Sequence, residues 1–256
     1  MLALVSPAKK LDFTEMAAPM FHSQPDFLER SAVLVEQAKK LSQVELARLM
    51  KLSDKLTDLN FQRFKAYSPP FTKSNAKQAA LAFNGDTYVG LDAPSLSEDD
   101  LVYAQDHLRI LSGLYGMLRP LDLIQPYRLE MGSRLQNPEG CDLYEFWGDD
   151  LAHAIDGIVA THKEPVVINL ASNEYFKAAR PETMQMRVIT PVFKEVKDGV
   201  AKVLGLFAKR ARGCMARYII TNRIEKSEKL KKFNRGGYAY QAELSNDHTW
   251  IFTRQR

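Results

Sequence analysis

The stretch EPVVINLAS, residues 164–172, carries an almost unbroken apolar run that ends in a serine. Such a run is typical of a short strand that is buried on both faces of a sheet. A second run, LALVS at residues 2–6, also ends in a serine, and the following Pro7 favours an extended backbone at Ser6. We therefore expect a central sheet that contains both segments, with a polar loop after each strand.

Segments with apolar residues at helical spacing surround these two strands in the sequence. Ser42 with Glu45 and Ser97 with Asp100 have the spacing of capping boxes, which mark helix starts. We expect the helix after Ser97 to continue to residue 111 and to end in the glycine-bearing segment that follows. Further helices are expected at residues 26–41, from Ser53, at 142–160, from Ser172 or Asn173, and at 214–233.

Three other segments have the pattern of strands. Residues 79–90 are expected to form a strand or a hairpin around Asn84-Gly85. Residues 186–196 and 200–213 are expected to form two strands joined by a turn at Asp198-Gly199. Together with the helices, these strands predict an α+β or mixed α/β fold, in which helices surround a central mixed sheet. Because no repeat or linker divides the chain, we expect one domain over residues 1–256.

The composition argues against several classes of protein. Charged residues make up 26% of the chain, and no apolar run approaches the roughly 18 residues of a membrane span. The first residues lack the pattern of a secretory signal, so we expect a cytoplasmic protein with no membrane partner. Cys141 and Cys214 lie far apart, and the five histidines lack the spacing of metal ligands, so neither a metal site nor a cofactor is expected.

The net charge of +4 hides an uneven distribution along the chain. Residues 194–235 hold thirteen Lys and Arg against four Asp and Glu, whereas residues 1–193 hold 20 against 25. A basic segment beside a mildly acidic body suits a phosphate-bearing partner. The same charge count is also expected of a solvated helix face, and the sequence leaves both readings open.

Polar side chains accompany the ends of the two expected buried strands. Ser6 and Lys9 follow the first strand, and Asn169, Ser172 and Tyr175 lie at the end of the second. Ligands gather at the carboxyl ends of parallel strands, so these residues are candidates for one shared site. The alternative is that the serines serve only local structure, before a proline and at a helix start.

A cluster of basic residues precedes the last expected helix. Lys209, Arg210 and Arg212 are followed by Gly213, where we expect a tight turn between a strand and a helix. Arginine presents a planar fork that fits phosphate oxygens, so these side chains are candidates for phosphate contacts. A solvated surface is the competing interpretation.

The stretch LRILSGLYGMLRPLDLIQPYRLEMG, residues 108–132, combines glycines with arginines and tyrosines. Gly113 and Gly116 would let a hairpin backbone approach a phosphate, as in a helix-hairpin-helix DNA-binding element. The alternative is a tight helix C-cap, with the tyrosines as packing residues. The other candidates for DNA contact in this stretch are Arg109, Ser112, Tyr115, Arg119, Tyr127 and Arg128.

Five segments in order carry a resemblance to a known family: LVSPAKKLDF, residues 108–132, DLYEFWGD, VVINLASNEYF and AKRARGCMARYIITNRI. Together they resemble the YaaA family of bacterial peroxide stress resistance proteins, over essentially the whole chain. The resemblance implies a cytoplasmic protein that limits intracellular iron and protects DNA. It also implies a mixed α/β fold with a basic cleft and a helix-hairpin-helix-like element, which maps here onto Ser112, Gly113, Tyr115, Gly116 and Arg119. No catalytic residue set accompanies it.

The leading hypothesis is thus a DNA-binding protein of the peroxide response, which binds duplex or locally unpaired DNA with little sequence preference. The alternative is an enzyme that acts on a nucleotide or nucleobase in a polar pocket around Lys9, Asn169 and Ser172. In that case Lys9 would be a nucleophile or would stabilise an oxyanion, and Asp122 or Glu130 would be the acid or base.

Overall fold

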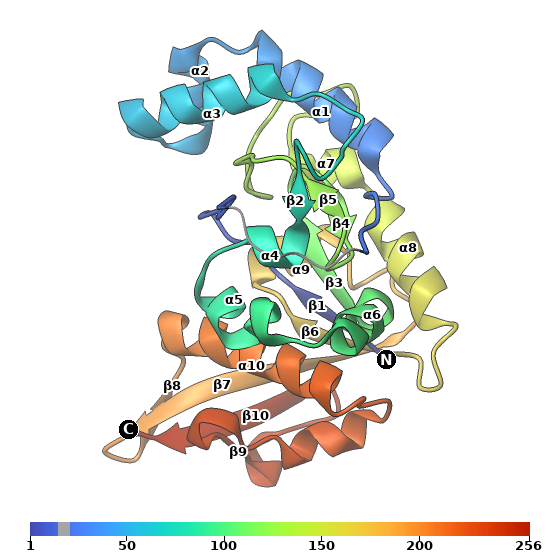
Figure 1. The fold of residues 1–256 in the computed structure, drawn as a ribbon. Helices are drawn as coiled ribbons and strands as arrows, with labels where there is room; N and C mark the ends of the chain where they lie inside the picture. The colour runs from blue at the N-terminus through green and yellow to red at the C-terminus, as the bar shows by residue number, and fades with distance from the viewer. Residues whose placement is uncertain (15–20) are drawn as a thin grey trace.

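In the computed structural model, which describes residues 1–14 and 21–256, one sheet runs through most of the molecule (Figure 1). Among the described residues it has eight strands: β1 (Leu2–Val5), β3 (Leu108–Ser112), β4 (Gly116–Leu118), β6 (Val166–Leu170), β7 (Arg187–Lys197), β8 (Val200–Lys202), β9 (Ala239–Tyr240) and β10 (Thr249–Gln255). A separate two-stranded ladder consists of β2 (Lys77–Gln78) and β5 (Leu123–Ile124).

The order across the large sheet is β4-β3-β1-β6-β7-β10-β9, and β8 pairs with β7. The neighbours from β3 to β10 are parallel, whereas β4, β8 and β9 are antiparallel to their partners. The prediction of a central mixed sheet is therefore confirmed. β1 and β6 lie side by side, with Leu2 opposite Val167 and Val5 opposite Leu170, and every residue of both strands is buried.

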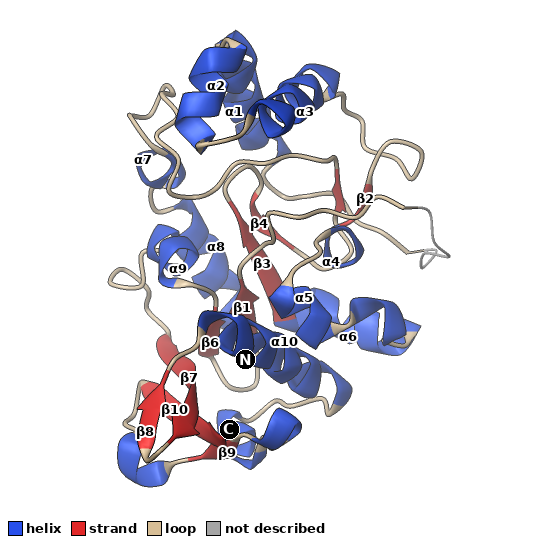
Figure 2. Ribbon diagram, turned by 90° about the vertical axis from the view of Figure 1, so that its left-hand side faces the viewer, coloured by secondary structure: helices blue, strands red, loops and turns tan. Residues whose placement is uncertain are grey.

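Helices cover both faces of this sheet. Figure 2 shows α8 (Asp150–Val159) and α9 (Asn173–Ala178) on one side of β1 and β3, and α5 (Asp86–Leu91), α6 (Glu98–His107) and α10 (Gly205–Thr221) on the other. The mixed α/β class is confirmed. The remaining helices are α1 (Leu28–Lys40), α2 (Gln43–Met50), α3 (Asp54–Ala66), α4 (Ala79–Ala82) and α7 (Leu143–Trp147), with 3₁₀ turns at Ala93–Ser95, Ser227–Lys232, Arg235–Gly237 and Ala242–Leu244.

Several helix starts and one turn occur where the sequence predicts them. Ser42 and Ser97 both form complete capping boxes, at the start of α2 and of α6. Ser172 is the N-cap residue of α9. The turn between β7 and β8 contains Asp198 and Gly199, which both have positive φ. These features depend on local backbone chemistry, which the sequence carries directly.

The helix-hairpin-helix-like element is not confirmed. The helix after Ser97 ends at His107, and residues 108–112 form strand β3 instead of the last turn of that helix. β3 pairs with β4 as an antiparallel hairpin, in which Ser112 lies opposite Gly116. The five residues of β3 are all buried, and a short, wholly buried apolar run does not distinguish a strand from a helix.

Three other expectations of secondary structure need correction. Residues 79–90 form the short helices α4 and α5 rather than a strand or hairpin. Strand β8 ends at Lys202, and α10 begins at Gly205, so residues 205–213 are helical rather than extended. The helix expected at residues 214–233 ends at Thr221 as part of α10, and Ser227–Lys232 form a 3₁₀ turn. Strand β10 has no counterpart among the expected elements. Each correction concerns a segment whose apolar positions suit more than one period, so tertiary packing selected the structure.

None of the helices among the described residues has the length and apolar composition that crossing a bilayer requires.

Candidate functional site

A cavity of about 480 Å³ lies where the loops after β1 and β6 come together. From β1 the chain proceeds to β3 on one side, and from β6 it proceeds to β7 on the other, so the two connections diverge at this point of the sheet. Ligands of open α/β sheets bind at such a point, outside the carboxyl ends of the strands. We call this space, lined among others by Ser6, Lys9, Ser172 and Lys209, the switch-point cavity.

Two serines connect the loops at the base of this cavity. The backbone N–H of Ser172 donates a hydrogen bond of 2.8 Å to Oγ of Ser6, and the two hydroxyl oxygens are 3.3 Å apart. The Tyr88 hydroxyl donates to the carbonyl oxygen of Ser6 at 3.1 Å. Burial raises the pKa of Tyr88 well above its ordinary value, so this phenol is neutral and acts as a donor.

Charged side chains of both signs surround the opening. Nζ of Lys9 is 2.7 Å from one carboxylate oxygen of Glu130, and Nη2 of Arg128 is 3.2 Å from the other. Glu174 accepts a hydrogen bond of 3.0 Å from the backbone N–H of Gly132. These contacts orient Lys9 and Glu130, whose side chains remain partly accessible. The carboxylate of Glu130 is therefore the acid or base candidate that belongs to this cavity.

Close packing of α5 against α10 brings further basic residues to the cavity. A Cβ atom on Gly213 would lie 1.8 Å from the carbonyl oxygen of Thr87, and one on Gly90 would lie 2.1 Å from that of Arg210. Only glycine allows this approach of two helix backbones. It places Lys209 and Arg212 of α10 beside the start of α5, where both line the cavity. Burial lowers the pKa of Arg212 from its ordinary value.

The prediction that Lys209, Arg210 and Arg212 occupy a turn before a helix is wrong, because all three lie within α10. Lys209 and Arg210 are exposed, and Arg212 is partly buried. The helical spacing of the buried Ala208, Ala211 and Met215 could have revealed this.

Two candidates from the second strand end have different surroundings. Tyr175 lines the switch-point cavity and is 9% exposed, and burial raises the pKa of its hydroxyl. Asn169 is 4% exposed, and its side chain accepts a hydrogen bond from the N–H of Ala171 and donates one to Thr190. Asn169 thus stabilises the loop after β6. Sequence reasoning missed other residues of the lining, among them Lys10, Asp86, Thr87, Tyr88 and Glu174.

The candidates in the β3–β4 hairpin lie in the protein core. Ser112 and Tyr115 are 0% exposed, and Tyr127 is 6% exposed. The Ser112 hydroxyl is 2.7 Å from that of Tyr127, and the Tyr115 and Tyr127 rings make an edge-to-face contact. A Cβ atom on Gly113 would lie 2.3 Å from the Leu129 carbonyl oxygen, and one on Gly116 would lie 2.7 Å from the Trp147 ring. The absence of a side chain at these two glycines therefore serves the packing of neighbouring chain segments.

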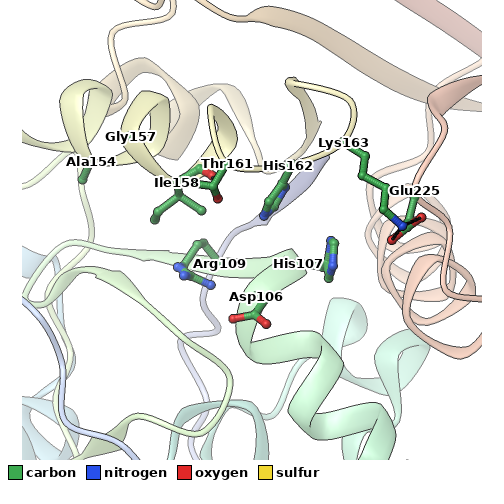
Figure 3. A pocket seen from close by; sticks show the side chains of 10 residues that line it. All are labelled: Asp106, His107, Arg109, Ala154, Gly157, Ile158, Thr161, His162, Lys163 and Glu225. Atoms are coloured by element: carbon green, nitrogen blue, oxygen red, sulfur yellow. Dashed lines mark hydrogen bonds and ion pairs between the residues drawn. The ribbon is translucent and has the colours of Figure 1, made fainter.

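Arg109 lies at the opposite end of β3 from the switch-point cavity. It is 6% exposed and lines a second cavity, of about 720 Å³, together with His107, His162 and the second half of α8 (Figure 3). Among the described residues, none lines both cavities.

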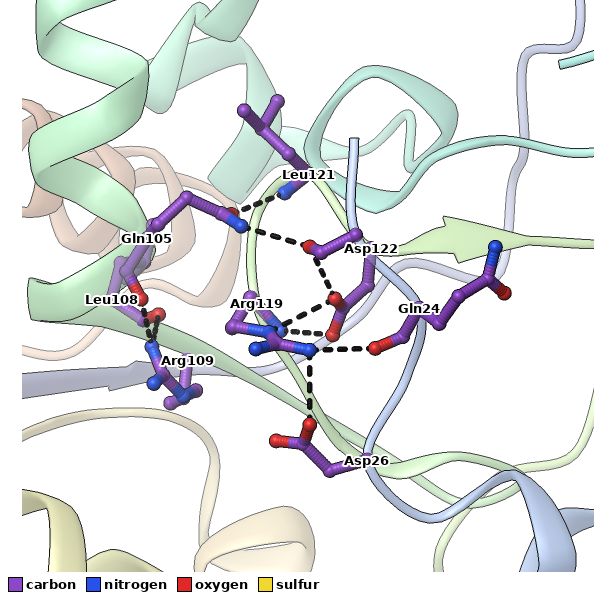
Figure 4. A network of polar contacts seen from close by, with 9 residues as sticks. Gln24, Asp26, Gln105, Leu108, Arg109, Arg119, Leu121 and Asp122 are labelled. Carbon is purple, nitrogen blue, oxygen red and sulfur yellow. Dashed lines mark hydrogen bonds and ion pairs between the residues drawn. The ribbon is translucent and has the colours of Figure 1, made fainter. Parts of the chain in front are cut away.

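Arg119 belongs to a structural network rather than to either cavity (Figure 4). Its Nε is 3.0 Å from Oδ1 of Asp122, and its Nη2 is 2.9 Å from Asp26. Asp122 is 0% exposed and also accepts a hydrogen bond of 2.6 Å from Ser23. Burial raises the pKa of Asp122, against the effect of these hydrogen bonds. Because Asp122 lines neither cavity, it does not fit the role of acid or base beside Lys9.

Within the described residues, no group of three or more His, Cys, Asp or Glu side chains is arranged to hold a metal ion.

Comparisons with known proteins cover nearly the whole chain. The sequence profile of the family described as peroxide stress protein YaaA matches residues 1–244. A UPF0246 protein of Ralstonia nicotianae is 54% identical over 255 residues, covering 100% of this chain and 99% of that protein. UPF0246 proteins of Magnetococcus marinus and of Shewanella baltica are 55% identical over 254 residues and 53% identical over 255, and each alignment covers at least 99% of both chains.

Proposed function

The chain belongs to the peroxide stress protein YaaA family, and from this premise we propose that it is a cytoplasmic DNA-binding protein of the peroxide stress response. One observation carries the proposal: four basic side chains from two distant segments line the switch-point cavity. We call them the basic rim, which consists of Lys9, Lys10, Lys209 and Arg212. Phosphate groups of a nucleic acid backbone are the natural partner of such a rim.

The charge of the surrounding segment supports the same partner. The exposed Arg210 lies next to the rim on α10, within the basic region 194–235. Lysine and arginine contacts to phosphates supply affinity and orientation but carry no sequence information. We therefore propose that the protein binds DNA with little sequence preference and that duplex and locally unpaired DNA both bind. The buried hairpin glycines and tyrosines have no part in this contact.

The proposal includes protection of DNA and limitation of intracellular iron during peroxide stress, as the family resemblance implies. If DNA binding is what protects the cell, a strain that carries a rim variant should accumulate as much peroxide-dependent DNA damage as a strain without the protein. Total cellular iron, measured in the same cultures, tests whether the effect on iron also requires the rim. Wild-type levels of damage in the rim variant would contradict the link between binding and protection.

The decisive experiment measures DNA affinity against salt concentration. Fluorescence anisotropy with labelled duplex, single-stranded and bubble DNA should give a Kd that rises steeply with salt, because bound phosphates release counterions. Lys10→Ala combined with Lys209→Ala should weaken binding to every sequence about equally. It should also make the salt dependence shallower by roughly two phosphate contacts.

A matched control removes the same charge elsewhere in the basic region. Lys229 and Lys232 are exposed and line neither cavity, so Lys229→Ala with Lys232→Ala should leave affinity near that of the parent. An equal loss in the two double variants would mean that overall charge, not the rim, attracts DNA. An affinity that does not change between low and physiological salt would overturn the proposal.

A second candidate function is an enzyme that acts on a nucleotide or nucleobase, and the geometry of the switch-point cavity favours it. Glu130 lies beside Lys9, and the hydroxyls of Ser6 and Ser172 line the same space. An ammonium group held at a carboxylate suits the stabilisation of an oxyanion better than nucleophilic attack, which requires a free amine. Glu130 would be the acid or base.

This candidate predicts that free nucleotides or nucleobases bind and are converted. Incubation with a panel of nucleoside monophosphates and bases, followed by chromatography, should reveal a product with the parent chain. Glu130→Gln should abolish product formation while ligand binding, followed by a thermal shift, persists. If no member of the panel shifts the melting temperature or reacts, the enzyme candidate is contradicted. DNA binding through the basic rim is then the function proposed for this cavity.

A further inference from the structure

The second cavity lies near the amino end of β3, at the opposite end of this strand from the switch-point cavity. It contains Arg109, on which the carboxylates of Asp122, Asp26 and Asp106 act from beyond ion-pair distance. Arg109 is 6% exposed, and within the described part of the chain no carboxylate forms an ion pair with it. Burying an unpaired cation is costly in free energy. Burial lowers the pKa of Arg109 to about 10, so the guanidinium is still charged at neutral pH.

The hydrogen bonds of Arg109 use only one corner of its guanidinium. Nη1 donates to the carbonyl oxygens of Gln105 and Leu108, the latter at 2.9 Å. Among the described residues the buried Nε has no partner, and no bond to Nη2 is formed either. Nε and Nη2 form the edge of a guanidinium that pairs with two oxygens of a carboxylate or phosphate. Nε is itself fully covered by the protein, so Nη2 is the nitrogen of this guanidinium that has no hydrogen-bond partner among the described residues and is not fully buried.

A second unpaired nitrogen lies in the same cavity. Figure 3 shows the ring of His162 above the space between Arg109 and His107. Its buried Nδ1 has no hydrogen-bond partner within the described residues. Burial lowers the pKa of His162 to about 4, although a backbone interaction with Met1 acts in the opposite direction, so its imidazole is neutral at pH 7 and carries one N–H. The ring of His107 stacks on Tyr103 with 3.9 Å between centroids, which fixes that side of the cavity.

The acidic residues that line this cavity do not form ion pairs with Arg109. Glu225 forms an ion pair of 2.7 Å with Lys163, so the charges of these two residues neutralise each other. Asp106 is exposed to solvent and forms no ion pair with Arg109. Among the described residues, the Arg109 guanidinium is therefore a buried charged group of this cavity that lacks an ion-pair partner.

We propose that this second cavity is a binding site for the oxyanion of a small molecule, a phosphate or a carboxylate, held by Nη2 of the Arg109 guanidinium, with the His162 ring beside it. The site is independent of the proposed DNA contact, because the two cavities share no described residue. The remainder of a bound molecule would occupy the space along α8, which Ala154, Gly157 and Ile158 line.

Isothermal titration calorimetry with inorganic phosphate and, separately, with acetate at constant ionic strength tests the site. We expect saturable binding of at least one anion, and comparison of the two titrations identifies the preferred group. Arg109→Lys retains the charge but lacks the fork, so it should raise the Kd by about tenfold or more. A shift of the His162 imidazole resonances on titration should report the same event.

A second variant keeps the test valid if Arg109→Lys does not fold. A Cβ atom on Gly157, which lines the cavity, would meet nothing within 4 Å, so we expect the side chain of Gly157→Leu to occupy cavity space and to abolish binding. The matched control is His153→Leu, which places the same side chain at an exposed position of α8 outside the cavity and should bind normally. If neither anion binds the parent chain, or if binding survives in Gly157→Leu, the proposal is overturned.

Discussion

The backbone N–H of Ser172 donates a 2.8 Å hydrogen bond to the hydroxyl of Ser6, 166 residues away in the chain. This bond joins the loop after β1 to the start of α9, and it closes the base of the switch-point cavity. Ser6 directly follows β1, and Ser172 follows β6 by two residues, so a serine just beyond each of two neighbouring parallel strands links the two strand ends. The predictions below test how such contacts shape the fold and the two cavities.

Ser6→Ala should lower the free energy of unfolding by about 1 kcal/mol, because it leaves the N–H of Ser172 without its acceptor in a partly buried place. Urea denaturation followed by circular dichroism measures the change. Ser74→Ala is the control, since that hydroxyl bonds only to the neighbouring Thr72 at the surface. Equal effects of the two substitutions would show that the link between the loops contributes nothing.

Gly116→Ala should destabilise the fold by about 3 kcal/mol, from overpacking and from a positive φ. Gly116 has φ of 68°, and an added Cβ would lie 2.7 Å from the ring of Trp147. Gly199→Ala separates the two causes, because Gly199 has φ of 77° with nothing within 4 Å of an added Cβ. Denaturation midpoints of both variants check this, and a cost no larger at Gly116 than at Gly199 would contradict the packing argument.

Gly213→Ala should destabilise the chain and also weaken DNA binding. Its Cβ would lie 1.8 Å from the Thr87 carbonyl oxygen, so α10 must move away from α5 and take Lys209 and Arg212 with it. Gly157→Ala is the matched control in another helix, because nothing lies within 4 Å of a Cβ added there. It should raise the free energy of unfolding by about 0.5 to 1 kcal/mol, since alanine has a higher helix propensity than glycine. Thermal melts and anisotropy on both variants test the coupling. If the Gly213→Ala chain folds and its DNA affinity is unchanged, the proposal that α10 contacts DNA is contradicted.

Arg119→Ala should destabilise the fold by about 3 kcal/mol at neutral pH, because it leaves the buried carboxylate of Asp122 without its counter-ion. Losing Arg119 raises the pKa of Asp122 further above its value in the unfolded chain. The cost should therefore be greatest near pH 7 and smaller at pH 4, because protonation of Asp122 removes the unpaired charge. Denaturation curves at both pH values measure it. The salt dependence of DNA binding should not change in this variant. A shallower dependence would indicate that Arg119 contacts a DNA phosphate.

His162 should make the fold less stable in acid. Its pKa is lowered by burial to about 4, whereas an unfolded histidine titrates near 6.5. Between these pH values the unfolded state binds more protons, so the contribution of His162 is complete above about pH 6.5 and is lost as the pH falls to about 4. His162→Phe should flatten this part of the stability profile relative to the parent, and the exposed His153→Phe should not. Parallel profiles for all three chains would contradict the assignment.

The sequence by itself determined the features that depend on neighbouring residues. The apolar runs at residues 2–5 and 166–170 became buried strands, since such short runs are stable only inside a sheet. Serine caps and the Asp198-Gly199 turn formed where expected, because side-chain hydrogen bonds and positive φ are local properties. Of the five residues expected to share one space, Ser6, Lys9, Ser172 and Tyr175 line the switch-point cavity, because carboxyl ends of adjacent parallel strands lie together. The fifth, Asn169, stabilises the loop after β6 instead.

Only the tertiary structure decided the role of the glycine-rich stretch and the place of the arginines. Gly113 and Gly116 look alike in sequence whether a phosphate or a neighbouring chain segment needs the space, and here Leu129 and Trp147 occupy it. Residues 108–112 and 205–213 suit helix and strand equally by apolar pattern, so pairing with β1 and packing on α5 selected the structure. The partners of an arginine are distant in sequence, which is why Arg109, Arg119 and Arg212 separated into three environments that no local pattern distinguishes.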